Sequence, residues 1–138
     1  MDNNKKILIL EDNVNHYRTI KEGVLLSEFE FEFHEVNLSD FIKEIKNDNA
    51  ISVIPTNIDL FIIDVILEKG HDELGLKFLL ELKSKYKNSF KYIVVSNWDK
   101  SEFETEIEID NNSFIDRNNY NGFELEFKIR NTINNLDL

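Results

Sequence analysis

The sequence predicts an α/β domain in which a five-stranded parallel sheet is covered by helices on both faces. Short apolar segments alternate with segments of helical periodicity along the chain, and this alternation is typical of β-α-β units. Three of the apolar segments are nearly continuous, as expected for strands buried on both faces. The length of 138 residues suits one domain. We therefore expect residues 1–138 to form a single domain without a separate output domain.

The first three elements are a buried strand, a helix and an edge strand. Residues 7–10 (ILIL) form a continuous apolar run that ends at polar residues, which predicts a buried strand. Residues 14–28 have apolar side chains at helical spacing. Residues 29–36 (FEFEFHEV) alternate strictly between apolar and polar. Such alternation indicates a half-exposed strand, which in a parallel sheet belongs at the edge.

The middle of the chain contains a second helix and a second buried strand. Residues 38–46 return to helical spacing, and we expect Ser39 to cap this helix. Residues 47–57 are irregular, and residues 58–63 (IDLFII) form a mostly apolar strand. Residues 68–72 contain a glycine and are expected to form a loop.

The last third of the chain continues the same alternation. An amphipathic helix is expected at 73–86, and a buried strand (YIVV) at 92–95. An acidic helix is expected at 99–109, a short strand at 113–115 and a closing helix at 122–135. Five strands then alternate with five helices, and right-handed crossovers make such a sheet parallel.

The composition excludes several classes of function. The chain has 27 acidic and 16 basic residues, for a net charge of −11, so we expect no binding to nucleic acid. It has no cysteine, which excludes disulfides, thiolate metal ligands and cysteine nucleophiles. No apolar stretch reaches the roughly 20 residues that span a bilayer, and no secretory signal is evident. We expect a cytoplasmic protein with no membrane partner.

The polar residues that follow the strands are the candidate functional residues. In an open α/β sheet, ligands bind beyond the carboxyl ends of the strands. The residues at these ends are Glu11, Asp12, Asp64, Ser96 and Arg117. Clustered carboxylates of this kind suit Mg²⁺, which prefers oxygen ligands. Asp64 can act as a nucleophile toward a phosphoryl group, while the metal and Arg117 neutralise its charge and Ser96 donates a hydrogen bond.

The sequence resembles the receiver domain of two-component response regulators. The resemblance rests on four segments that occur in the same order at the strand ends and extend over nearly the whole chain: ILILEDN at 7–13, DLFIIDV at 59–65, YIVVSN at 92–97 and SFIDR at 113–117. It implies a flavodoxin-like (βα)5 fold with strand order 2-1-3-4-5. It also implies a signalling domain with Mg²⁺ as cofactor and no enzymatic activity beyond self-phosphorylation and self-dephosphorylation.

The resemblance also implies a role for each matched residue. Asp64 corresponds to the phosphoacceptor, Asp12 to the direct metal ligand and Glu11 to a ligand acting through water. The backbone carbonyl of Ile66 would complete the metal site. Ser96 corresponds to the hydroxyl that moves toward the phosphoryl group, and Phe114 to the aromatic residue whose rotamer follows that movement.

The implied partners are proteins. The phosphoryl group would come from a histidine kinase or a phosphotransfer protein. The signal would leave through the face formed by helix 99–109, strand 113–115 and helix 122–135, which would bind a downstream protein target or a second copy as a homodimer.

Three residues depart from the family pattern and support an alternative. Arg117 stands where the family has lysine, Asn118 where it has a cis-proline, and Asn97 where it prefers a small residue. The alternative is a pseudo-receiver, a protein–protein interaction module that works without phosphorylation. Two further readings fit less well. A Mg²⁺-dependent phosphatase of the haloacid dehalogenase type needs an aspartate at the position of Ile66, and a flavin carrier needs a Ser/Thr/Gly-rich phosphate loop after the first strand. His16 is expected to be an exposed helix residue.

Overall fold

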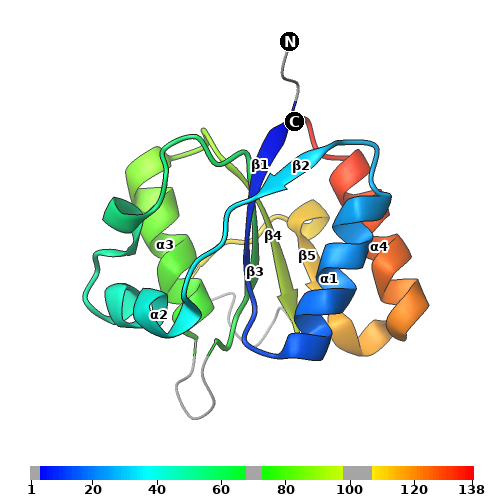
Figure 1. Ribbon diagram of the computed structural model, residues 1–138, viewed down its shortest axis with the longest axis horizontal. Coiled ribbons are helices and arrows are strands. Elements are labelled where there is room, and N and C mark those ends of the chain that lie inside the picture. The colour runs from blue at the N-terminus through cyan, green and yellow to red at the C-terminus, as the bar shows by residue number, and fades with distance from the viewer. Residues whose placement is uncertain (1–3, 68–72, 98–106) are drawn as a thin grey trace.

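The computed structural model describes residues 4–67, 73–97 and 107–138, and it has the predicted α/β architecture (Figure 1). The sheet is five-stranded with the order β2-β1-β3-β4-β5, and all four pairings are parallel. The strands are β1 (Lys5–Leu10), β2 (Phe31–Phe33), β3 (Leu60–Asp64), β4 (Lys91–Ser96) and β5 (Phe114–Asp116). The flavodoxin-like strand order implied by the resemblance is confirmed.

Helices cover both faces of this sheet. The described α-helices are α1 (Val14–Leu26), α2 (Leu38–Lys46), α3 (Leu74–Tyr86) and α4 (Gly122–Asn134), and the 3-10 turns are η1 (Ala50–Val53), η3 (Asn111–Ser113) and η4 (Arg117–Asn119). Figure 1 shows α2 and α3 on one side of the sheet and α1 and α4 on the other. No helix among the described residues is long and apolar enough to span a membrane.

The strands divide the core into two layers because successive side chains point to opposite faces. Leu8 and Leu10 pack on the α2–α3 side, whereas Ile7 and Ile9 pack on the α1–α4 side. All four side chains are buried. Burial on both faces explains the continuous apolar run, and it also sets the register, since a shift by one residue would exchange the two layers.

Two sequence predictions near the sheet edge are corrected in detail. β2 is an edge strand, as predicted, but it contains Phe31–Phe33 rather than residues 29–36. Within the described ranges β2 pairs only with β1, and the paired register ends at Ile7↔Phe33. The N-cap of α2 is Asn37 rather than Ser39, because the Asn37 side chain accepts a hydrogen bond from the Asp40 amide at 3.1 Å.

Two predicted segments lie wholly or partly outside the described residues. The loop predicted at 68–72 is one, and residues 98–106 of the acidic helix predicted at 99–109 are the other. The end of that predicted helix is wrong, because residues 107–110 belong to no helix. Ile107 and Ile109 are buried and join the core on the α2–α3 side.

Gly75 brings α3 against the carboxyl end of β3. Its amide donates to the Val65 carbonyl at 2.8 Å. A Cβ atom at this position would lie 1.8 Å from the carbonyl oxygen of Asp64 and 3.0 Å from Cγ2 of Ile63. Only glycine allows the helix to approach the strand this closely, and the contact fixes the backbone of Asp64.

Candidate functional site

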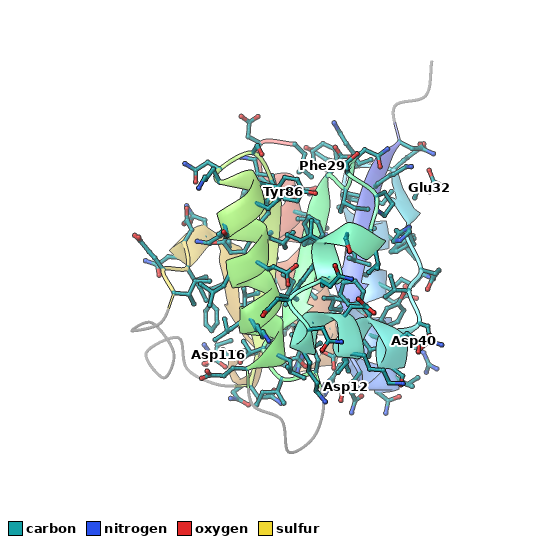
Figure 2. The ribbon with its side chains drawn as sticks, turned by 90° about the vertical axis from the view of Figure 1, so that its left-hand side faces the viewer. Asp12, Phe29, Glu32, Asp40, Tyr86 and Asp116 are labelled. Carbon is teal, nitrogen blue, oxygen red and sulfur yellow. The ribbon has the colours of Figure 1, made fainter. Side chains whose placement is uncertain are left out.

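The carboxyl ends of the strands form one end of the molecule, and the candidate residues meet there. Figure 2 shows Asp12 and Asp116 at this end and Phe29 and Tyr86 at the opposite end. A pocket of about 370 Å³ opens between the strand ends. Its lining consists of Glu11, Asp12, Asn13, His16, Asp64, Ile66, Ser96, Asn97 and Arg117. All five residues predicted from the strand ends therefore line a single pocket.

The sheet register places these residues side by side. Asp64 is the last residue of β3 and pairs with Val95, one residue before Ser96. Ser96 in turn pairs with Asp116, directly before Arg117. Glu11 follows the last residue of β1, which pairs with Ile63. The ends of four adjacent strands thus position these residues, and no long loop is needed.

Three carboxylates converge in the pocket. The side chains of Glu11, Asp12 and Asp64 each offer an oxygen, and these oxygens lie within 4.8 Å of one another. Glu11 and Asp64 are only 6% and 8% exposed, while Asp12 is exposed. Oxygen donors at this spacing fit a hard metal ion, because like charges removed from water need a cation to neutralise them. The triad can hold a metal ion.

Burial raises the pKa of both inner carboxyl groups. The pKa of Asp64 rises to about 8, first because the group is removed from water and then because the carboxyl of Glu11 lies beside it. The pKa of Glu11 is also raised, mainly by burial, although contacts with Asp64 and Arg117 oppose the rise. The two groups titrate together. Without a bound cation, the pair therefore retains a proton near neutral pH.

Arg117 is a buried cation in the lining of the pocket. Its Nη2 atom lies 2.9 Å from Oε2 of Glu11 but 4.0 Å from Oδ2 of Asp64. Its Nη1 atom donates to Oδ1 of Asn97 at 3.4 Å. The residue is 8% exposed, and its Nε atom has no hydrogen-bond partner in the described part of the chain. The guanidinium thus binds Glu11 more closely than the predicted phosphoacceptor.

Asn118 links the ends of β4 and β5. Its side-chain amide donates to the backbone carbonyl of Asn97, and its backbone amide donates to Oδ1 of Asp116 at 2.9 Å. Proline could make neither bond, since it lacks both the amide hydrogen and the side-chain donor. The turn after β5 is therefore held by side-chain hydrogen bonds.

Sequence reasoning missed the position of His16. The side chain was expected to be exposed, but it is partly buried, lines the pocket, and has Nδ1 3.7 Å from Oε1 of Glu11. Burial lowers its pKa, and the charge of Arg117 lowers it further. The signal in the sequence is the N-cap residue Asn13, whose side chain accepts from the His16 amide at 3.0 Å and whose own amide donates to Oε1 of Glu11 at 3.0 Å. This cap ties the first turn of α1 to Glu11.

Ser96 and Phe114 differ in their relation to the pocket. Ser96 is 2% exposed and belongs to the pocket lining. Phe114 is partly buried, packs against the core layer on the α2–α3 side and is not one of the residues that line the pocket. The structure therefore brings Ser96 to the pocket, and it pairs the backbone of Phe114 with Val94 of β4.

Comparisons with known proteins support the fold. No family model matches the sequence, and no curated protein matches it. Among solved structures, the chain is similar to one described as a trimeric coiled coil of yeast Spc42 fused to another structure, with a TM-score of 0.51 and 18% identity. The similarity covers 81% of this chain and 65% of that chain. At this identity, the similarity shows a shared fold and nothing about function.

Proposed function

We propose that this domain accepts a phosphoryl group on Asp64 with the help of Mg²⁺, and that phosphorylation changes a surface used for protein binding. The observation that carries the proposal is the position of Asp64. It lies at the end of a central strand, within 4.8 Å of the two other carboxylates, in a pocket that also contains a hydroxyl and a guanidinium. A nucleophile, metal ligands and charge-neutralising groups are the parts that phosphoryl transfer requires.

The proposed reaction forms an acyl phosphate. A carboxylate oxygen of Asp64 attacks the phosphorus of a phosphohistidine or a small acyl phosphate, and a P–O bond forms. The bond from phosphorus to the leaving group breaks, and the leaving imidazole or carboxylate departs with its electron pair. Mg²⁺, when bound, neutralises charge on the phosphoryl oxygens. Only the ionised form of Asp64 is a nucleophile, so its raised pKa has to be lowered by nearby cations.

The other residues of the pocket would bind and orient the phosphoryl group. Asp12, Asp64 and the carbonyl of Ile66 would hold the metal directly, and Glu11 would act through water. Ser96 would donate its hydroxyl to a phosphoryl oxygen, with Phe114 following as the switch. The partners in this scheme are a histidine kinase or phosphotransfer protein and a downstream protein, or a second copy of the chain. No enzymatic turnover of another substrate is expected.

The test is the intact mass of the protein after incubation with Mg²⁺ and acetyl phosphate. We expect a phosphoryl adduct on the wild-type chain and none on Asp64→Asn. The matched control is Asp116→Asn, which changes another aspartate at the same end of the sheet and should still form the adduct. An adduct on Asp64→Asn would show that another residue is the acceptor, and its absence from every variant would refute the proposal for this donor.

One observation favours a second function. The guanidinium of Arg117 is closer to Glu11 than to Asp64, and this cation can neutralise the pocket without a metal. The domain would then be a pseudo-receiver that binds partners without phosphorylation. A protein that remains unmodified by both acetyl phosphate and a panel of phosphorylated histidine phosphotransfer proteins, with no change in its amide spectrum when Mg²⁺ is added, would favour this function.

A further inference from the structure

A second pocket lies at the amino end of the sheet, opposite the candidate functional site. It has a volume of about 760 Å³, and small-molecule sites typically measure about 300–1,000 Å³. Its lining includes Lys87 after the end of α3, Lys91 at the start of β4, Ser113 directly before β5 and Asn135 directly after α4. Figure 2 shows Tyr86, the last residue of α3, at this end of the molecule. The two pockets share no lining residue.

Two lysines of this amino-end pocket have no counterion among the described residues. Lys87 is exposed and Lys91 is half-buried, and neither side chain forms an ion pair or a hydrogen bond in that part of the chain. The Asp110 carboxylate is occupied, because it accepts from a backbone amide of its own turn at 2.9 Å. Glu108 contributes its backbone carbonyl, which accepts from Nζ of Lys83 at 2.6 Å. Cations that line one pocket repel each other unless an anion neutralises them, so the two lysines are available to an anionic ligand.

The backbone of Lys87 has an unusual conformation. Its φ of 57° and ψ of −118° lie in a region that residues other than glycine rarely adopt. Glycine is the common residue where a helix ends in this way. The amide of Lys87 donates to the Lys83 carbonyl at 3.0 Å, which fixes the residue at the end of α3. Strained residues of this kind concentrate at ligand sites, and this one places a lysine at the pocket.

Two hydroxyl groups in the pocket have hydrogens left to donate. Ser113 is only 8% exposed, and its hydroxyl forms no hydrogen bond within the described part of the chain. The Tyr92 hydroxyl accepts from the Asp110 amide at 3.2 Å, so its own hydrogen is not used in that bond. A nearly buried hydroxyl without a partner is unfavourable. The oxygen atoms of a ligand would provide acceptors for both groups.

Aromatic rings form one wall of the pocket. Phe90 and Tyr92 both line it, and their ring centroids are 5.7 Å apart. Nζ of Lys83 lies 5.1 Å from the ring centroid of Tyr92 while it donates to the Glu108 carbonyl, so it holds this ring against the segment before β5. Phe90 also packs on the buried ring of Phe61 at a centroid distance of 6.1 Å. The wall is therefore preformed and offers an apolar surface to the organic part of a ligand.

We propose that the amino-end pocket binds a small organic phosphate. The phosphate group would accept hydrogen bonds from Lys87, Lys91 and Ser113, and the organic part would lie against Phe90 and Tyr92. A phosphate offers several acceptor oxygens, and lysine binds phosphate as a point charge. Ammonium and hydroxyl donors at one site therefore match this group. The proposal does not depend on the function proposed above.

The acidic residues of the pocket limit the size of the anion. Glu108, Asp110 and Asp137 line it together with the lysines, and the whole chain has a net charge of −11. Charges more than a Debye length apart, about 10 Å at 0.1 M salt, are largely screened. A single phosphate group bound at the lysines is therefore affected mainly by them. A polyanion such as nucleic acid would extend to the carboxylates and be repelled.

The experiment follows the backbone amide spectrum of the full chain during titrations with adenosine monophosphate (AMP), adenosine and inorganic phosphate. We expect AMP to shift the amides of Lys91 and Ser113, and to bind at least roughly tenfold more tightly than adenosine, because adenosine lacks the charged hydrogen bonds. Inorganic phosphate should shift the same amides but bind more weakly than AMP, since it makes no contact with the aromatic wall.

The variants are Lys87→Gln, Lys91→Gln and Ser113→Ala, with Lys85→Gln as the matched control. Lys85 belongs to α3 and its replacement changes the net charge equally, but it does not line this pocket. We expect each of the first two variants to weaken AMP binding roughly tenfold and Ser113→Ala to weaken it by a smaller factor. Lys85→Gln and Asp64→Asn should bind AMP as the wild type does. Thermal unfolding of each variant checks that it is folded.

Several results would overturn the proposal. Equal affinity for AMP and adenosine would exclude recognition of the phosphate, and equal affinity for AMP and inorganic phosphate would exclude the aromatic contact. Shifts at Glu11 and Asp12 in place of Lys91 and Ser113 would assign the anion to the other pocket. Undiminished binding by both lysine variants, or no shift with millimolar AMP or phosphate, would also refute it. None of these results bears on the phosphorylation proposed above.

Discussion

Replacement of Gly75 by alanine tests how α3 positions the phosphoacceptor. The added Cβ atom would lie 1.8 Å from the carbonyl oxygen of Asp64, whereas ordinary contacts begin at 3.4 Å. The carbonyl oxygen of Asp64 is a backbone atom, so it cannot rotate out of the way as a side chain could. The helix therefore has to retreat from β3 by more than an ångström, and the carbonyl of Asp64 moves with the strained segment.

The expected loss of stability follows from two opposing terms. Forcing extra atoms into a packed core costs typically about 1–3 kcal/mol, and occasionally more. Alanine regains up to about 1 kcal/mol over glycine inside a helix. Because the overlap here is with rigid backbone, we expect the upper end of the first range and a net destabilisation of about 2 kcal/mol.

The assay is urea unfolding followed by circular dichroism, together with the phosphorylation assay. Gly122→Ala is the matched control, because its Cβ atom would meet nothing within 4 Å, and it should be neutral or slightly stabilising. Gly23→Ala places its Cβ atom 2.7 Å from Cβ of Ile129 in α4. It should destabilise the fold but leave phosphorylation unchanged while the protein is folded. Equal stability of Gly75→Ala and Gly122→Ala would refute the reasoning.

Three further perturbations probe the pocket and the core. The pKa of Asp64 is about 8 in the folded state against an ordinary value of 3.8, so the folded state binds more protons than the unfolded state. The stability of the metal-free protein should therefore fall as the pH rises from 4 to 8. Thermal unfolding of Asp64→Asn at several pH values should show no such fall. Asn118→Pro removes the bonds to Asp116 and Asn97 and should cost about 1–2 kcal/mol in urea unfolding. Phe78→Ala empties a fully buried position and should cost about 3–5 kcal/mol in the same assay.

The strands and the gathering of the acidic residues could be predicted from the sequence because they depend on burial. A run such as residues 7–10 is apolar throughout only when both faces are covered, and its end therefore marks the rim of the sheet. Once the strands are parallel, residues directly after them have to meet at one edge. Glu11, Asp12 and Asp64 followed from this rule, without any knowledge of distances.

The end of β2, the N-cap of α2 and the partner of Arg117 could not be predicted, because in each case the sequence offers several similar local alternatives. The alternation in 29–36 continues beyond Phe33, but the paired register with β1 ends at Ile7↔Phe33, so pattern alone overestimated the strand. Asn37 and Ser39 are both good N-cap residues, and only the position of the first helical turn decides between them. In the same way, the sequence names Arg117 as a cation at the rim but does not say which carboxylate it binds.

The three departures from the receiver pattern form one connected unit in the structure. Arg117 donates to the side chain of Asn97, Asn118 donates to the backbone carbonyl of the same residue, and Asp116 accepts from the Asn118 amide. A guanidinium has more donors than an ammonium and needs a second acceptor when it is buried. Asn97 supplies that acceptor, and Asn118 holds Asn97. A single change of Arg117 to lysine would therefore remove the hydrogen bond to the side chain of Asn97 and leave both hydrogen bonds of Asn118 in place.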